Sequence, residues 1–189
     1  MSVTRNPLIA LLAVVMSACS APAPEPTPGA TASAPTMAAC ADTDEPPDAD
    51  VYAYFHCAGA ELDPPRPVGR PAPAADPSSR LEAAVRGLLA GPTQAEREAG
   101  YISLFSEQTD LALNSVELGD DGVAIVDFAD LRVVLNNAST SMGSQILLAQ
   151  LNATVFQIPE VDAVEYRIHG SCDTFWEWLQ RACEVLPRP

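Results

Sequence analysis

The sequence predicts an α+β domain in which two main helices lie on one face of a mixed β-sheet, with a short helix at the C-terminus. Apolar residues recur at helical spacing within residues 76–90 and 139–158. Runs with the β-branched or aromatic composition of strands occupy residues 51–57, 111–129 and 164–168. The order is strand–helix–strand–strand–helix–strand. Two helices with apolar stripes can bury them by packing on one face of a sheet, which gives the predicted α+β arrangement.

The first elements are a strand, an edge segment and a helix. Residues 51–57 form the first strand, and the prolines in residues 61–69 restrict a return strand to the sheet edge. Asp76 is the expected N-cap of the first helix, with Pro77 at its first position. One face of this helix is apolar, formed by Leu81, Ala84, Val85, Leu88 and Leu89. Gly91-Pro92 ends it, and Thr93 to Glu96 is a capping box that opens a short second helix.

The later elements follow from turn and cap residues. A Gly-Asp-Asp-Gly turn at 119–122 joins two strands into a hairpin, and a break of phase between Leu113 and Val116 predicts a β-bulge. Ser139 or Ser141 caps the next long helix, and residues 164–168 form the last strand. A second capping box, Thr174 to Glu177, begins a terminal helix that we expect to reach residue 182.

The N-terminus has the features of a lipoprotein signal. Arg5 precedes an apolar run at residues 8–16, which is too short to span a bilayer and is typical of a secretory signal. The Ser17-Ala18-Cys19 sequence that follows resembles the lipobox of bacterial lipoproteins. We therefore expect Cys19 to be lipidated with acyl chains of the palmitate type and to anchor the protein to the outer face of the cell membrane. An ordinary signal peptide, cleaved nearby, is the alternative.

Four regions follow from composition: a signal peptide at 1–18, a lipid-anchored tether at 19–50, the main domain at 51–171 and a helical extension at 172–189. The tether is disordered in this interpretation, because it is rich in Pro and Ala and carries acidic but no basic residues. The whole chain has 25 acidic and 10 basic residues, a net charge of −15. This balance argues against nucleic-acid partners and against electrostatic docking onto anionic lipid.

With Cys19 lipidated, four cysteines remain, and an even number in an exported protein predicts two disulfides. A complete helix between Cys172 and Cys183 would hold their Cα atoms roughly 16 Å apart, beyond disulfide reach. If the first and last strands are neighbours, the favoured pairing is Cys40–Cys172 with Cys57–Cys183. The runner-up is Cys57–Cys172 with Cys40–Cys183. The chain has no compact cysteine pairs of the kind that bind zinc.

Few residues are candidates for chemistry. His56 and His169 stand near strand ends and could meet if those strands are neighbours, but the interpretation we favour is two partly exposed histidines. Asp127 is expected to accept a hydrogen bond from a loop or helix N–H rather than to catalyse. The Asp120-Asp121 pair is explained by its turn. Trp176 is a candidate exposed anchor for a partner, since Trp is enriched at interface hot spots.

Several segments together resemble the GerMN domain of sporulation and spore germination proteins. They are Leu88–Thr93 with Glu96 and Gly100, Val123–Phe128, Asn152–Phe156, Ile158–Val161 and Val164–Gly170. The tail from Gly170 to Leu179 is similar to that of actinobacterial lipoproteins of this type. The resemblance covers roughly residues 51–171. It implies a fold similar to ring-building motifs and a membrane-tethered extracytoplasmic module without catalysis.

We therefore expect a non-enzymatic binding or assembly module in the cell envelope, with a protein partner or self-assembly, no cofactor and no metal. The alternatives are an envelope hydrolase, which rests only on the expected location, and a carrier of a small ligand or lipid, which requires a large apolar cavity.

Overall fold

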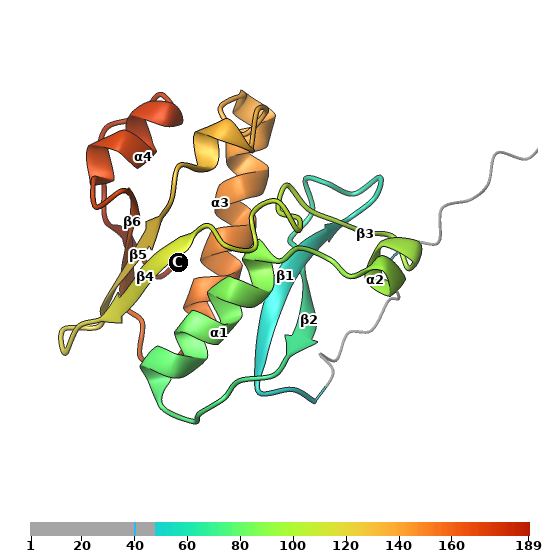
Figure 1. The fold of residues 1–189 in the computed structure, drawn as a ribbon, viewed down its shortest axis with the longest axis horizontal. Coiled ribbons are helices and arrows are strands. Elements are labelled where there is room, and N and C mark those ends of the chain that lie inside the picture. The colour runs from blue at the N-terminus through green and yellow to red at the C-terminus, as the bar shows by residue number, and fades with distance from the viewer. Residues whose placement is uncertain (1–39, 41–47) are drawn as a thin grey trace, which may run out of the picture. The chain divides into compact units, whose positions relative to one another are not determined.

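The structure is a computed structural model, and it describes residue 40 and residues 48–189. These residues form two β-sheets with helices between them (Figure 1). The first sheet has the order β2-β1-β3, with β1 at Val51–Cys57, β2 at Arg66–Arg70 and β3 at Tyr101–Ile102. The second has the order β4-β5-β6-β7, with β4 at Leu113–Leu118, β5 at Val123–Phe128, β6 at Ala163–Ile168 and β7 at Leu186–Pro187. Strands β5 and β6 are parallel, and the other pairs are antiparallel.

The two long helices lie between the sheets (Figure 1). The helices are α1 (Pro77–Leu89), α2 (Gln94–Glu98), the short 3-10 helix η1 (Leu131–Val133), α3 (Ser141–Phe156) and α4 (Cys172–Trp178). Helix α1 contacts both β1 and β4, and α3 contacts β1 and α1. The expected α+β class and the expected order of the main elements are confirmed.

The assumption that the first and last strands are neighbours is wrong. Strand β1 pairs with β2 and β3, whereas β6 pairs with β5 and β7. On the edge of β1 away from β2, strand β3 pairs only with His56 and Cys57, and helix α3 occupies the rest. Gln157, the residue that ends α3, accepts from the Tyr52 N–H at 2.7 Å and donates to the Tyr52 carbonyl at 2.6 Å. Thr154 Oγ1 accepts from the Tyr54 N–H at 3.2 Å. Because these side chains satisfy the rest of this edge, no strand other than β3 is needed there.

Most local predictions are confirmed. Asp76 caps α1, and Thr93 with Glu96 forms the capping box of α2. The register shift in β4 lies between Leu113 and Ser115, where the bulge was expected. The cap of α3 is Thr140, whose Oγ1 accepts from the Gly143 N–H at 3.0 Å, rather than Ser139 or Ser141.

The C-terminal helix differs from the prediction at both ends. It is capped by Ser171, three residues before the predicted Thr174, and it ends at Trp178 instead of continuing to residue 182. Gln180 adopts a left-handed conformation with φ of 61°, and the Arg181 N–H donates to the Trp176 carbonyl. The chain therefore turns back on itself and continues into β7.

This reversal overturns both expected disulfide pairings. The bridges are Cys40–Cys57 and Cys172–Cys183, with Cα–Cα distances of 5.6 and 5.4 Å. Because α4 stops at Trp178, the separation of roughly 16 Å for a full helix does not apply, and Cys183 returns to Cys172. The four predicted cysteines are thus paired, but each bridge joins residues close in sequence.

Candidate functional site

The two histidines lie in different parts of the fold. His56 belongs to β1 and is buried with 2% exposure, which contradicts the expectation of a partly exposed side chain. Its Nδ1 is 3.1 Å from the Asp63 carbonyl. Burial lowers the pKa of His56, against weaker opposing contributions from the backbones of Ile146 and Asp63 and from Glu61. His169 is exposed beyond the end of β6 in the other sheet. The strands that carry the two histidines are therefore not neighbours.

Asp127 supports the turn that leads into α4. Its Oδ1 accepts from the Gly170 N–H at 2.6 Å, and its Oδ2 accepts from Asn114 Nδ2 at 3.0 Å. This agrees with the expected role as an acceptor for a loop N–H.

The Asp120-Asp121 turn is also as expected. Asp121 Oδ1 accepts from the Val123 N–H at 3.1 Å, and Gly122 has a φ of 77°, which glycine adopts without strain. Within residues 40 and 48–189, no group of three or more His, Cys, Asp or Glu side chains is placed to hold a metal ion.

The expectation that Trp176 is an exposed anchor is wrong. Its side chain has 0% exposure, and the Arg181 guanidinium lies 5.0 Å from its ring centroid. The reversal after α4 places Arg181 over the face that a continued helix would have left open. Trp178 is half-buried and makes an edge contact with Phe175. A hot-spot role for Trp176 therefore lacks the accessible surface it requires.

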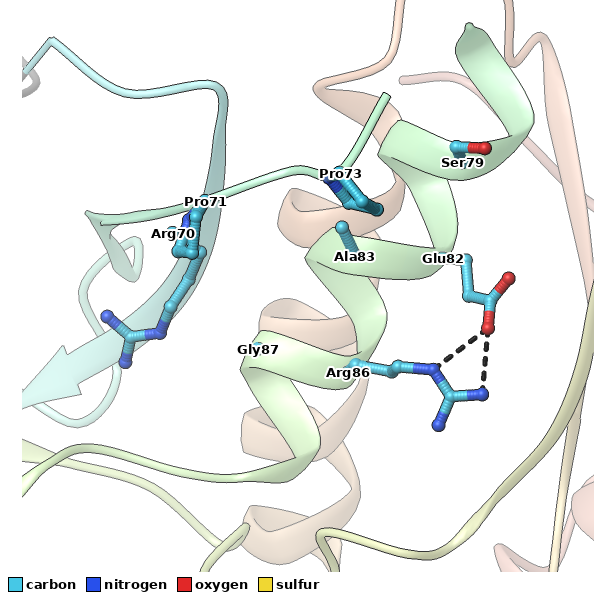
Figure 2. A pocket seen from close by; sticks show the side chains of 8 residues that line it. All are labelled: Arg70, Pro71, Pro73, Ser79, Glu82, Ala83, Arg86 and Gly87. Carbon is cyan, nitrogen blue, oxygen red and sulfur yellow. Dashed lines mark hydrogen bonds and ion pairs between the residues drawn. The ribbon is translucent and has the colours of Figure 1, made fainter. Parts of the chain in front are cut away.

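A groove of about 440 Å³ lies between α1 and the connection from β2 (Figure 2). On one side are Pro71 and Pro73, and on the other are Ala83 and Gly87 of α1. Figure 2 shows Pro73 next to Ala83 and the Arg70 side chain next to Gly87. The lining is mainly apolar, with Ser79 and the ion pair Glu82–Arg86 at its rim.

The charged groups of this groove are paired with other protein groups. Glu82 and Arg86 form a surface ion pair at 2.7 Å. Arg70 donates two hydrogen bonds of 2.8 Å to the carboxylate of Glu96, and its Cζ lies 5.5 Å from the Phe55 ring centroid. The groove thus offers a mainly apolar surface whose charged lining groups are already paired.

Arg70 also contacts Glu96, one of the GerMN-like residues, and packs against Gly87 just before that segment. Glu96 accepts from the Thr93 N–H at 2.8 Å as well as from Arg70. Burial alone would raise the pKa of Glu96, but the hydrogen bonds from Arg70 and Thr93 outweigh it and lower that pKa. A Cβ on Gly87 would lie 2.7 Å from Arg70 Cγ, so glycine leaves the space for the arginine stem. A glycine in the middle of a predicted helix was the available sequence signal for this close approach.

The predicted lipidation site Cys19 lies outside the described residues. No helix in the part of the chain that the structure describes is long and apolar enough to cross a membrane.

Among known proteins, similarity is found to solved structures and to one family model. No curated protein matches the chain. Among solved structures, the first GerMN domain of the sporulation protein GerM from Bacillus subtilis has 21% identity and a TM-score of 0.46, over 64% of this chain and 82% of that one. The tandem GerMN domains of GerM from Bacillus subtilis have 21% identity and a TM-score of 0.45, over 64% of this chain and 39% of that one. A candidate lipoprotein from Clostridium perfringens has 15% identity and a TM-score of 0.43, over 73% of this chain and 86% of that one.

The family model described as sporulation and spore germination matches residues 52–172, which is more than half of the chain. The matched segment runs from β1 to the first residue of α4 and includes both long helices. The chain therefore belongs to the Germane family.

Proposed function

We propose that the protein is a lipoprotein of the cell envelope whose Germane domain binds a partner without catalysing a reaction. The observation that carries the proposal is the chemistry of the α1 groove. Its lining is mainly apolar, and the charged side chains Arg70, Glu82 and Arg86 are each paired with protein groups. Such a surface can accept an apolar side chain from a partner, whereas hydrolysis requires a free nucleophile, base or metal.

The anchor is tested first. Cys19→Ala should release the protein from the membrane fraction and abolish its labelling by a radioactive fatty acid, because only the lipid holds the domain at the bilayer. Cys19→Ser serves as a second variant with a closer shape. Retention of either variant in the membrane fraction would contradict the lipoprotein proposal.

The groove is tested by site-specific photo-crosslinking in living cells. A photoreactive residue at Ala83 should give a defined crosslinked product, because this half-buried position lines the groove. The same residue at Glu98, exposed on α2, is the matched control and should give none. Equal products at both positions, or none at Ala83, would argue against partner binding in the groove.

The hydrolase alternative has a direct test. Turnover of peptidoglycan by the purified protein, lost in Asp127→Asn or His169→Gln, would establish an enzyme and overturn the proposal. We expect no turnover by the wild type, since Asp127 is already bonded to Gly170 and Asn114.

A further inference from the structure

The four-stranded sheet has one face that no described element covers. Its inner face is buried and carries Ala124, Val126 and Phe128 of β5 together with Val164, Tyr166 and Ile168 of β6. Helix α4 also packs on this inner side, with Phe175 5.3 Å from the Tyr166 ring. Side chains alternate along a strand, so the residues between these point to the opposite, outer face. Figure 1 shows α1 and α3 on one side of β4, β5 and β6 only.

The register of the strands places charged and apolar residues of the outer face in rows. Glu117 of β4 is opposite Ile125 of β5, and Ile125 is opposite Glu165 of β6. We call these three residues the Glu-Ile-Glu row. Neighbouring strands are about 4.8 Å apart, so the two glutamates are separated by about 10 Å with a half-buried isoleucine between them.

The outer face is negatively charged. Beside the Glu-Ile-Glu row lies a second row of Ser115, Asp127 and Arg167. Arg167 is the one cation of the two rows, and it is paired with Glu165 at 2.5 Å. The hydrogen bond to Glu165 raises the pKa of Arg167 despite an opposing effect of burial, and Asp127 and Glu117 raise it further. Three carboxylates therefore face one guanidinium.

The negative charge of the outer face decides which kind of partner can bind there. The chain's own residues 20–39 and 41–47 contain four acidic and no basic residues. A second copy of the domain would place the same negative rows against each other, and anionic lipid would be repelled as well. Glu165 already has Arg167 as a partner, so three carboxylates against one guanidinium leave a net charge of −2 over the two rows. A partner that covers Ile125 and offsets this charge must present an apolar side chain between two cations.

We propose that the outer face binds a cationic amphipathic helix of a partner protein, lying across the strands along the Glu-Ile-Glu row. Helical residues i and i+7 are about 10.5 Å apart, close to the separation of about 10 Å between the two glutamates. Lys or Arg at these positions would pair with Glu117 and Glu165, and a Leu at i+3 or i+4 would cover Ile125. This inference rests on the proposed binding function and adds to the α1 groove a second surface with a stated partner chemistry.

The test uses the full chain and a synthetic helical peptide that carries Lys at i and i+7 and Leu at i+3 and i+4. Binding is measured by fluorescence anisotropy at low salt. Glu117→Lys with Glu165→Lys should weaken binding by about tenfold or more, because attraction becomes repulsion. Glu98→Lys with Glu107→Lys makes the same change of net charge at exposed positions elsewhere and should leave affinity within about twofold. If the double variant unfolds, Glu117→Lys alone is tested instead, because Glu117 is exposed and its replacement should leave the fold intact while still weakening binding.

Equal weakening in the row and control variants, or equal affinity for a peptide with Glu in place of both Lys, would overturn the inference. In-cell crosslinking separates this result from the proposed function. A product from a photoreactive residue at Ser115 supports the outer face. A product from Ala83 without one from Ser115 would retain partner binding and refute the outer face, and no product from either position would refute both.

Discussion

The two sheets close their exposed edges in different ways, although each has a short-range disulfide beside it. In the N-terminal sheet, the part of one edge of β1 that β3 leaves free is satisfied by side chains of α3, about 100 residues away in sequence. In the C-terminal sheet, the edge of β6 is covered by the backbone of β7, from the same end of the chain. Stability of the first sheet therefore depends on a remote helix, and that of the second depends on the tail.

The tail is fixed at two points. Trp176 is fully buried beneath the returning chain. Arg188 donates to the carbonyls of Phe156, Ile158 and Val161, where α3 ends and the chain turns toward β6. Since the last carbonyls of a helix have no partner within it, a guanidinium at this point stabilises the helix end. The C-terminal extension is thus part of the domain core.

The largest effect is expected at Trp176. Trp176→Ala should lower the free energy of unfolding by about 3–5 kcal/mol, because it opens a cavity in the core. Trp178→Ala is the matched control, and its loss should be clearly smaller because that side chain is half-buried. Urea denaturation measures both. Equal losses would mean that the tail does not enclose Trp176 in solution.

The disulfides come next. Non-reducing peptide mapping should recover Cys40–Cys57 and Cys172–Cys183, which are 17 and 11 residues apart. Replacing either pair by Ser should cost about 3 kcal/mol from chain entropy. Cys183 is exposed whereas Cys40 is buried, so mild reductant should open the C-terminal bridge first. A Cys40–Cys172 peptide would refute the local pairing.

Two polar substitutions compare the edges directly. Arg188→Ala should cost about 2–3 kcal/mol, because charged hydrogen bonds to half-buried carbonyls at the end of α3 are lost. Gln157→Ala should cost about 1–2 kcal/mol, since the neutral amide bonds to Tyr52 are lost. Hydrogen exchange should show faster exchange in β7 for the first variant and in β1 for the second. The opposite pattern would contradict this assignment of the two edges.

The smallest effect is a pH dependence from His56. Its pKa is lower in the folded protein than the ordinary value of about 6.5, so the unfolded state binds a proton more readily. Stability from this residue is complete above that ordinary value and falls as the pH decreases through it toward the lowered pKa. The slope cannot exceed about 1.4 kcal/mol per pH unit. Urea denaturation between pH 7.5 and 5.5 should show it in the wild type but not in His56→Gln, and an unchanged slope would refute the role of His56.

Features set by neighbouring residues could be predicted from the sequence. The apolar stripe of α1, the capping box at Thr93 and the bulge near Leu113 each depend on residues a few positions apart. The groove could not be located from the sequence, because it forms only when the connection after β2 lies against α1. Gly87 indicated a close approach to its helix but not which segment approaches.

By itself, the sequence determined the class of fold, the order of the main elements and the role of Asp127 as an acceptor for a loop N–H. Only the tertiary structure decided the separate sheet of β1, the disulfide pairing and the burial of Trp176. The edge of β1 is satisfied by hydrogen bonds from the side chains of Thr154 and Gln157, about 100 residues away, and no local sequence pattern predicts this pairing. The other two follow from a reversal at Gln180 in a left-handed conformation, where the sequence has neither the glycine nor the asparagine that usually marks one.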